Sequence, residues 1–225
     1  PKAVAAKVPE LHLGQEVRRF HLGESWLELA DGQRISFETT VFTGSLPCLM
    51  DCIEDPLPEE VRSARSSLRW VRVANLALGV AAPAPVDQHW LYFPDLELPF
   101  YRVGFPSNHS AHAPEGCHTV SIEVSLDPEG GDVPQLLHGA ELALADKGLL
   151  DRDAIEVRQT TVMDPAYAVF DHARRQAVAT LRSYLSARGI LLSGRWAEWK
   201  YSAMEDAVLD GIAVARRLTR RGASG

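Results

Sequence analysis

Residues 190–212 read ILLSGRWAEWKYSAMEDAVLDGI, the most informative stretch of this sequence. An apolar strand, Ile190 to Leu192, runs into a Gly-Arg turn and an aromatic-rich bend, after which the pattern predicts a helix. Ser202 with Glu205 three positions later forms a capping box, so we expect the helix amides to begin near Ala203. Free amides and the positive end of the helix dipole then point the same way, which makes an anion site in principle.

The helix after the bend is predicted to be amphipathic. Its acidic residues lie mostly off one face, as an amphipathic helix requires. The small and apolar residues that share that face are Met204, Ala207, Val208, Gly211, Ile212 and Ala215. The small residues imply a close packing partner. We expect an exposed apolar face unless another copy of the chain covers it, so self-association through this face is a further expectation.

Upstream of this stretch, helices and strands alternate. Helices are expected at 134–147 and at 171–188, where Gly189 stops the second, and they flank a strand at 155–163. An earlier helix is expected over 58–68, because a proline and two glutamates come first and arginines follow. Four further strands are expected between these helices, at 71–80, 89–93, 101–104 and 119–124.

Apolar and polar residues alternate in the first forty residues, as they do in β-strands. Asp31-Gly32 lies between two of them and is a strong hairpin signal, because glycine accepts the positive φ that a tight turn requires. The apolar stretch Thr40 to Leu46, which ends at Pro47, is predicted to be a buried strand. The fold class expected from all of these elements is mixed α+β, in which the early and middle strands form a central, largely antiparallel sheet covered by helices.

Composition and charge exclude several classes of protein. A net charge of -7 argues against a surface that holds nucleic acid, which needs clustered cations. No apolar run is long enough to cross a bilayer. Cys48, Cys52 and Cys117 are an odd number and lack the paired spacing of zinc sites, so we expect buried, inert thiols, no metal site and a cytoplasmic protein.

The motif GRWAEWKYSAMEDAVLDG resembles the carboxy-terminal flavin motif of the FAD-dependent amine oxidase and protoporphyrinogen oxidase superfamily, with UDP-galactopyranose mutase as a cousin. That resemblance implies FAD as the cofactor and assigns its contacts to Gly194, Arg195, Ala203, Met204 and Glu205. Two further stretches resemble the family's strand and hairpin passages, ESWLELADGQRISFETTVFTGSLPCLM and HWLYFPDLELPFYRVGFPSNHSAHAP. In the family the second stretch would place Arg102 against a small-molecule substrate, although Arg102 on the wet face of the sheet is an equal alternative. Tyr167, in DPAYAVFDHAR, resembles the aromatic residue that lines the family's substrate cavity, and the alternative for it is a plain core residue.

The family's dinucleotide fingerprint, G-x-G-x-x-G, does not occur in this sequence. We therefore expect a substrate-binding-like domain over 1–189, a strand, turn and helix over 190–219 that return to a nucleotide-binding half, and a frayed tail over 220–225. The chain is expected to be part of an FAD-dependent oxidoreductase, inactive alone, and to bind FAD only with that missing half. A mutase-like flavoenzyme and a non-catalytic binding or assembly domain remain open as alternatives.

Overall fold

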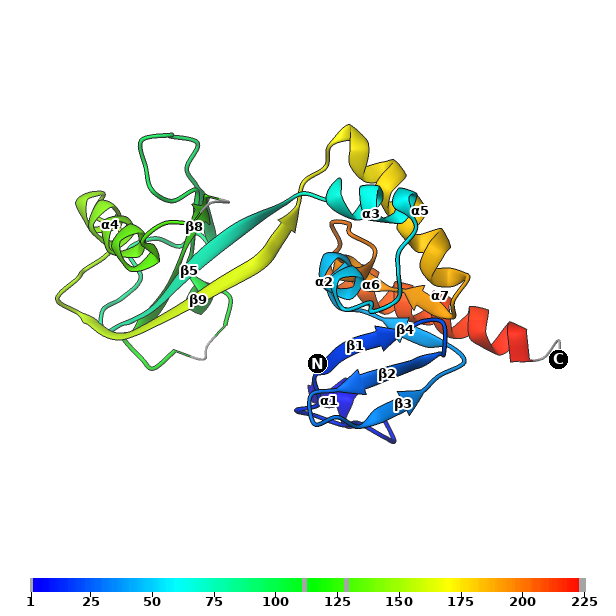
Figure 1. The fold of residues 1–225 in the computed structure, drawn as a ribbon. Helices are drawn as coiled ribbons and strands as arrows, with labels where there is room; N and C mark the ends of the chain where they lie inside the picture. Colours follow the sequence, from blue (N-terminus) through cyan, green and yellow to red (C-terminus); the bar gives the residue numbers. More distant parts are fainter. Residues whose placement is uncertain (1, 111–112, 128–129, 223–225) are drawn as a thin grey trace. The chain divides into compact units, whose positions relative to one another are not determined.

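The computed structural model describes residues 2–110, 113–127 and 130–222, which form two compact units (Figure 1). Unit 1 comprises residues 1–69 and 170–225, and unit 2 comprises residues 70–169. The mixed α+β class with antiparallel sheets is confirmed. The expectation of one central sheet is wrong, because the early and middle strands form separate sheets. Within the described residues, no helix is long and apolar enough to cross a membrane.

Unit 1 holds the chain's first and last elements. Its elements are α1 (Lys2–Ala5), β1 (Val17–His21), β2 (Trp26–Leu29), β3 (Arg34–Ser36), β4 (Thr40–Phe42), α2 (Leu46–Asp51), α3 (Glu59–Ser66), α5 (His172–Ser186), β10 (Ile190–Leu192), α6 (Gly194–Ala197) and α7 (Met204–Gly222). Helix α3 packs against α5, and α5 packs against β10. Helix α7 continues through Gly222, three residues beyond the expected end at residue 219.

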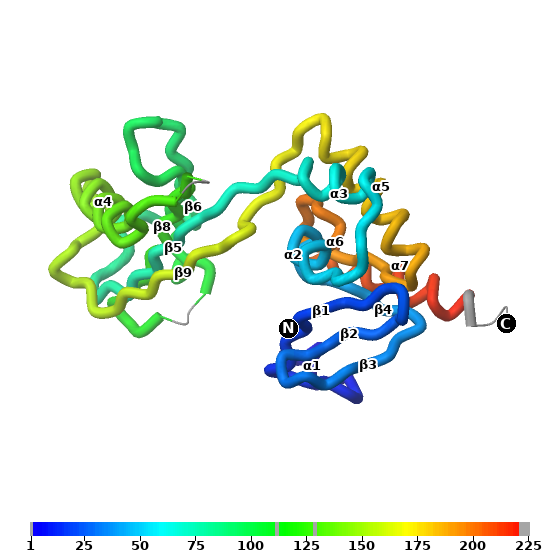
Figure 2. Tube along the Cα trace, in the orientation of Figure 1, coloured from blue at the N-terminus to red at the C-terminus, as the bar shows by residue number. Residues whose placement is uncertain are grey.

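An antiparallel meander opens unit 1 and confirms the predicted hairpin. Strands β1, β2 and β3 lie side by side in that order, as the trace in Figure 2 shows. Gly32 in the turn between β2 and β3 has a φ of +85°, a conformation that costs glycine little because it has no Cβ. Leu27 and Leu29 are buried, so this strand contributes its alternate side chains to the core.

Strand β4 differs from its prediction. It spans only Thr40–Phe42, has an exposed residue at its centre, and pairs in parallel with β10 from the far end of the chain. The expected continuation to Leu46 is wrong, because Leu46 and Pro47 begin helix α2. Proline suits the first turn of a helix, since that turn leaves its N–H groups unbonded in any case. The parallel pair of β4 and β10 places residue 193 at the start of the turn predicted to meet the cofactor.

The described residues of unit 2 form a five-stranded antiparallel sheet, one α-helix and a short 3₁₀ helix. The strands are β5 (Trp70–Val80), β6 (Trp90–Tyr92), β7 (Arg102–Gly104), β8 (His118–Leu126) and β9 (Ile155–Ala168), in the spatial order β6-β7-β8-β5-β9. A short 3₁₀ helix, η1 (Pro106–Asn108), follows β7, and α4 (Val133–Asp146) follows β8. The long strands β5 and β9 run side by side along this unit (Figures 1 and 2).

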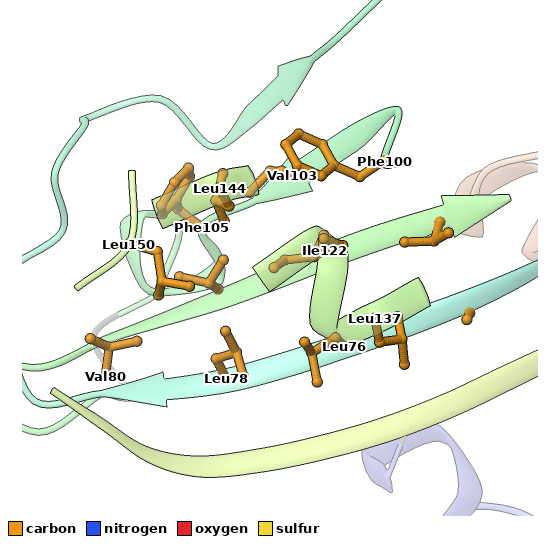
Figure 3. Packing of buried hydrophobic residues seen from close by; sticks show 14 of the residues in the cluster. Leu76, Leu78, Val80, Phe100, Val103, Phe105, Ile122, Leu137, Leu144 and Leu150 are labelled. Carbon is orange, nitrogen blue, oxygen red and sulfur yellow. The ribbon is translucent and has the colours of Figure 1, made fainter. Parts of the chain in front are cut away.

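One face of this sheet forms the core of unit 2 with helix α4. Alternate residues of β5 and β8 point toward the helix, as the period of two in a strand requires. Figure 3 shows these side chains together: Leu76, Leu78 and Val80 of β5, Ile122 of β8, and Leu137 and Leu144 of α4. All are buried, so the opposite face of the sheet is the one left for polar side chains.

Aspartate side chains set the starts of the two long central helices. Asp132 accepts a hydrogen bond from the amide of Gln135 at the start of α4, and Asp171 accepts one from the amide of Arg174 at the start of α5. Each bond satisfies one of the amides that the first turn of a helix leaves unpaired. Gly189, with a φ of +78°, ends the segment after α5 as predicted.

Candidate cofactor-facing site

The turn after β10 is open. Ser193 is extended, and Gly194 then adopts a φ of +85°, which favours glycine over residues that carry a side chain. A Cβ placed at Gly194 would meet no atom within 4 Å. Gly194, the first residue of α6, therefore combines a positive φ with open space beside its backbone. This agrees with the prediction that the turn is not sealed inside the core.

Arg195, the second residue of the turn, lies among aromatic rings. Its guanidinium carbon is 5.4 Å from the centroid of Trp196 and 5.5 Å from that of Tyr201. Tyr201 in turn stacks on Phe170 with a centroid separation of 4.8 Å. Stacking engages the face of a guanidinium group, and the positive charge of Arg195 makes it a candidate partner for an anion at this turn.

Helix α7 begins differently from the predicted capping box. The first helical residue is Met204, and the Ala203 amide donates to the Asp206 side chain at 2.7 Å. The Ser202 hydroxyl makes no hydrogen bond within the described part of the chain. The predicted box of Ser202 and Glu205 is therefore wrong by one position, because the Asp206 carboxylate reaches back to the residue before the helix. This carboxylate also complements the positive end of the helix dipole.

A pocket of about 650 Å³ joins the turn to the amino end of α7. Four of the five predicted cofactor residues line it, namely Gly194, Arg195, Ala203 and Met204. Glu205 is exposed and does not line the pocket. The remaining walls are mostly small or apolar and come from β4 and the residue after it, the turn and α6, the bend, and α7: Val41, Thr43, Ser193, Trp196, Ser202, Ala207, Gly211, Val214, Ala215 and Leu218. The glycine and alanine residues of α7 thus leave room where larger side chains would fill the pocket.

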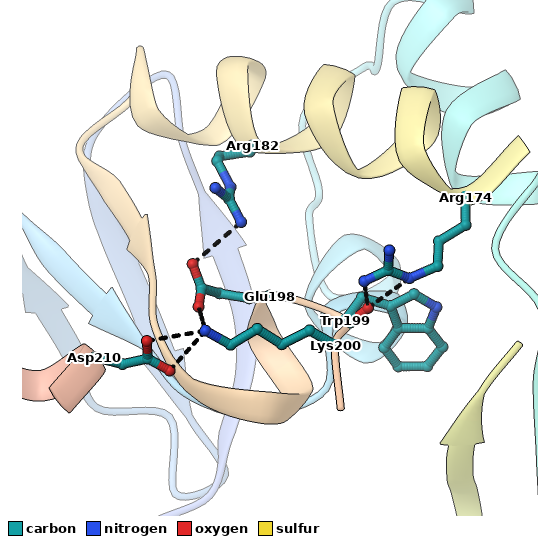
Figure 4. A network of polar contacts seen from close by, with 6 residues as sticks. All are labelled: Arg174, Arg182, Glu198, Trp199, Lys200 and Asp210. Atoms are coloured by element: carbon teal, nitrogen blue, oxygen red, sulfur yellow. Dashed lines mark hydrogen bonds and ion pairs between the residues drawn. The ribbon is translucent and has the colours of Figure 1, made fainter. Parts of the chain in front are cut away.

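The bend between the turn and α7 is held by Arg174 of helix α5. Trp199 is fully buried and has a positive φ of 51°, an uncommon conformation for a residue of its size. Both Nε and Nη2 of Arg174 donate to the Trp199 carbonyl oxygen, the first at 2.7 Å (Figure 4). Two charged donors on one carbonyl fix the peptide at this strained residue. Sequence reasoning missed Arg174, whose partner lies 25 residues away.

An ionic network next to Arg174 ties the bend to helices α5 and α7. The Lys200 ammonium lies between Glu198, at 2.5 Å, and Asp210 of α7, at 2.9 Å, while Arg182 of α5 donates to the same Glu198 (Figure 4). Burial lowers the pKa of Lys200, but the hydrogen bonds to Glu198 and Asp210 raise it more, so its net shift is upward. The network therefore stays charged and orients α7 on the bend.

The two predicted substrate residues meet in unit 2. Arg102 Nη2 donates to the Tyr167 hydroxyl at 2.8 Å and to Glu123 at 2.5 Å, and its guanidinium carbon is 4.7 Å from the Trp90 ring centroid. Burial lowers the pKa of Arg102, but hydrogen bonds to Glu123 and Tyr92 raise it more. Glu123 is buried and offsets the charge of Arg102, so the pair is nearly neutral.

Tyr101 completes this cluster. Its hydroxyl donates to Glu123 at 2.6 Å, and burial together with that hydrogen bond raises the pKa of Tyr101 well above its ordinary value. Tyr101 thus remains a neutral donor. Glu123 was not singled out from the sequence, although a glutamate within the apolar strand His118–Leu126 is a signal that could have found it.

The chain matches no known protein-family model. It is similar to solved structures over most of its length. Against a reduced UDP-galactopyranose mutase the TM-score is 0.80 at 20% identity, covering 89% of this chain and 46% of that one. Against a putrescine oxidase variant redesigned for cofactor binding it is 0.70 at 16% identity, covering 97% and 51%.

A third similar structure is a putative protoporphyrinogen oxidase from Exiguobacterium sp. 255-15, with a TM-score of 0.64 at 12% identity, covering 86% of this chain and 43% of that one. The chain thus spans about half the length of the structures that it matches. The resemblance inferred from residues 190–212 is confirmed at the level of the fold. The chain therefore shares its fold with the matching portions of the mutase and the two oxidases.

Proposed function

We propose that this chain is the substrate-side portion of an FAD-dependent oxidoreductase and is inactive by itself. The observation that carries the proposal is the pocket that joins Gly194 and Arg195 to the amino end of α7. It lies where the motif resemblance assigns the cofactor contacts. The shared fold supports the same assignment, since it was found without reference to the motif.

The residues of this pocket fit part of a flavin dinucleotide. Gly194 leaves open space beside the backbone, Arg195 supplies a cation for phosphate oxygens, and Ala203 and Met204 lie at the positive end of α7. The Asp206 carboxylate disfavours an anion directly at the Ala203 amide, so we assign the phosphate contact chiefly to Arg195. When bound, FAD would take a hydride from a substrate C–H bond while the neighbouring atom loses a proton, so that a C–N or C–C single bond becomes a double bond; the protein orients and shields the reacting groups.

The backbone hydrogen-bonding groups at one edge of β4 support the proposal that a further strand pairs with it. Thr40 donates to Gly189 and Phe42 accepts from Ser193, so the backbone groups of both residues face β10. The groups of Val41 between them must point to the opposite edge, where Val41 is 39% exposed and lines the pocket. Two parallel strands seldom stand alone, because parallel sheets are buried on both faces. We assign this edge to the nucleotide-binding half.

For the substrate side we retain Arg102 and Tyr167, which meet on the polar face of unit 2. Since Glu123 offsets the charge of Arg102, we propose that Arg102 orients Tyr167 toward the substrate and does not itself bind a substrate carboxylate. The substrate is a small molecule in this proposal. The expected burial of the thiols is wrong, since Cys48 is exposed and Cys52 and Cys117 are half-buried, but all three are free, which accords with a cytoplasmic location. The exposed apolar residues of α7, such as Met204 and Val208, accord with self-association or with cover by the missing half.

The test uses the full reading frame that contains this sequence. The purified protein should be yellow, and its flavin content after dialysis should fall by about tenfold or more in Arg195→Met, because a charged hydrogen bond to phosphate is worth about 1.5–3 kcal/mol. Arg188→Met is the matched control, since Arg188 stacks on Tyr184 outside the pocket. Colourless protein, or equal flavin loss in both variants, would refute the proposal and favour a non-catalytic binding domain.

A mutase-like flavoenzyme is the second candidate. The specific observation in its favour is the TM-score of 0.80 with the reduced mutase structure, over 89% of this chain. Both candidates predict yellow protein. Oxygen consumption with stoichiometric peroxide release during substrate turnover favours the oxidase, whereas turnover of a sugar nucleotide without net electron transfer favours the mutase.

A further inference from the structure

A second, larger groove in unit 1 has no place in the proposed function. It has a volume of about 1000 Å³ and lies between α5, β10 and α7. Its floor is apolar, with the buried strand Ile190–Leu192 beneath it and Val178 and Val214 on the walls. From Arg175 to Ser186 its α5 wall extends about 16 Å at 1.5 Å per residue. These dimensions are those of a small-molecule site.

The rim of this groove is strongly cationic. Five cations line it, Arg174, Arg175, Arg182, Lys200 and Arg217, against the single carboxylate Glu198. Helix α5 carries three of them and no carboxylate between His172 and Ser186. The whole chain has a net charge of -7, so this concentration of positive charge is local and not a general property of the surface.

The cationic side chains of the groove differ in how many of their hydrogen-bond donors already have an acceptor. Arg174 is bound to the Trp199 carbonyl, and Lys200 is bound by Glu198 and Asp210. Arg182 spends one donor on Glu198, at 3.1 Å, and Arg217 approaches only the Ser186 hydroxyl, at 3.4 Å. A separation of 3.4 Å is long for a hydrogen bond, and each guanidinium carries five N–H donors. Most of the donors on Arg182 and Arg217 therefore have no acceptor within the described residues.

The positive charges also repel one another. Burial lowers the pKa of Arg174, and the charge of Arg182 lowers it further, while Asp171 only partly opposes the shift. An anion bound at the groove would relieve this repulsion. At one end of the groove both walls supply hydrogen-bond donors. There Arg217 of α7 lies beside Ser186 of α5, and Ser186 is one helical turn along α5 from Arg182.

We propose that this end of the groove binds the phosphoryl group of a small organic phosphate. Arg182 and Arg217 supply guanidinium donors, and Ser183 and Ser186 supply hydroxyl donors that suit phosphate oxygens. The apolar body of the ligand lies along the floor formed by Ile190–Leu192. A bounded groove with an apolar floor fits such a molecule better than a membrane surface or a nucleic acid duplex, which need broad cationic surfaces.

The experiment measures binding of phenyl phosphate to the 225-residue chain at constant ionic strength, with inorganic phosphate and phenol as separate probes. Phenyl phosphate should bind saturably with one site, inorganic phosphate roughly tenfold more weakly because it buries no ring, and phenol not measurably. Arg217→Met should weaken phenyl phosphate by roughly tenfold or more. Arg216→Met is the matched control, because Arg216 is exposed like its neighbour Arg217 but does not line the groove.

Three results would overturn the proposal: no saturable binding of phenyl phosphate, equal affinity in the two arginine variants, or phenol binding as tightly as phenyl phosphate. Circular dichroism of both variants checks that α7 remains folded. The proposal is independent of the flavin site. Arg195→Met should leave phenyl phosphate binding unchanged, since Arg195 lines the other pocket, so failure of one proposal does not decide the other.

Discussion

Replacing Gly189 by alanine tests how the site is positioned. Gly189 has a φ of +78°, and its carbonyl accepts the hydrogen bond from Thr40 that begins the pairing of β4 with β10. An alanine Cβ would lie 2.5 Å from the Glu38 carbonyl oxygen, which belongs to backbone and cannot swing aside. Left-handed strain costs about 1–2 kcal/mol. Displacement of β4 then weakens one or two hydrogen bonds worth about 1 kcal/mol each, so we expect a loss of about 2–4 kcal/mol.

Gly32→Ala is the matched control in the same unit. Gly32 has a similar φ of +85°, yet a Cβ there would meet nothing within 4 Å, so only the backbone strain applies. Urea unfolding monitored by hydrogen exchange and mass spectrometry on peptides from unit 1 gives the free energy of unfolding of each variant. Gly189→Ala should be the more destabilising by about 1–2 kcal/mol. Equal losses in the two variants would refute the close contact between residue 189 and the Glu38 carbonyl that precedes β4.

Three further variants test other parts of the structure. Arg174→Met should destabilise unit 1 by about 1.5–3 kcal/mol in urea, because the Trp199 carbonyl loses its charged donors; a loss under about 0.5 kcal/mol would contradict the clamp. Glu141 is buried and bonded to Arg158 and Arg152, and the hydrogen bond from Arg158 is the main cause that lowers its pKa. Its stabilisation is thus present at neutral pH and lost as the pH falls below the ordinary glutamate value of about 4.3, so in Glu141→Gln the urea midpoint should depend less on pH through that range; an unchanged pH profile would count against the ion pairs. In Gly104→Ala the new methyl would overlap the ring of Trp90, so the tryptophan emission should shift, whereas Gly116→Ala, with open space around it, should leave the emission unchanged.

Local patterns predicted most of the secondary structure. The Asp31-Gly32 turn, the charge order of α3 and the apolar strand Ile190–Leu192 depend on neighbouring residues, and all three agree with the structure. The predicted strand from Thr40 to Leu46 was wrong in length. Its pairing partner lies about 150 residues away in β10, and the proline that was expected to end a strand instead begins a helix.

The assignment of cofactor contacts stays a prediction. Four of the five assigned residues, Gly194, Arg195, Ala203 and Met204, line one pocket, but the contacts that support this pocket were not predicted. The helix cap was misassigned because the sequence offers two carboxylates three residues after a possible first position, Glu205 after Ser202 and Asp206 after Ala203. Spacing alone does not decide between these two pairs. The clamp from Arg174 and the Glu123 cluster depend on contacts across many residues, which local pattern does not encode.

The central claim is that the turn at Gly194-Arg195 and the start of α7 meet a flavin dinucleotide held mainly by another portion of the protein. Hydrogen exchange measures this directly when the 225-residue chain is compared with the full-length flavin-bound protein. The account predicts slower exchange in the full protein for the segment 40–43, in which the backbone groups of Val41 point away from β10, and for residues 194–207. Equal exchange of both segments in the two proteins would contradict it.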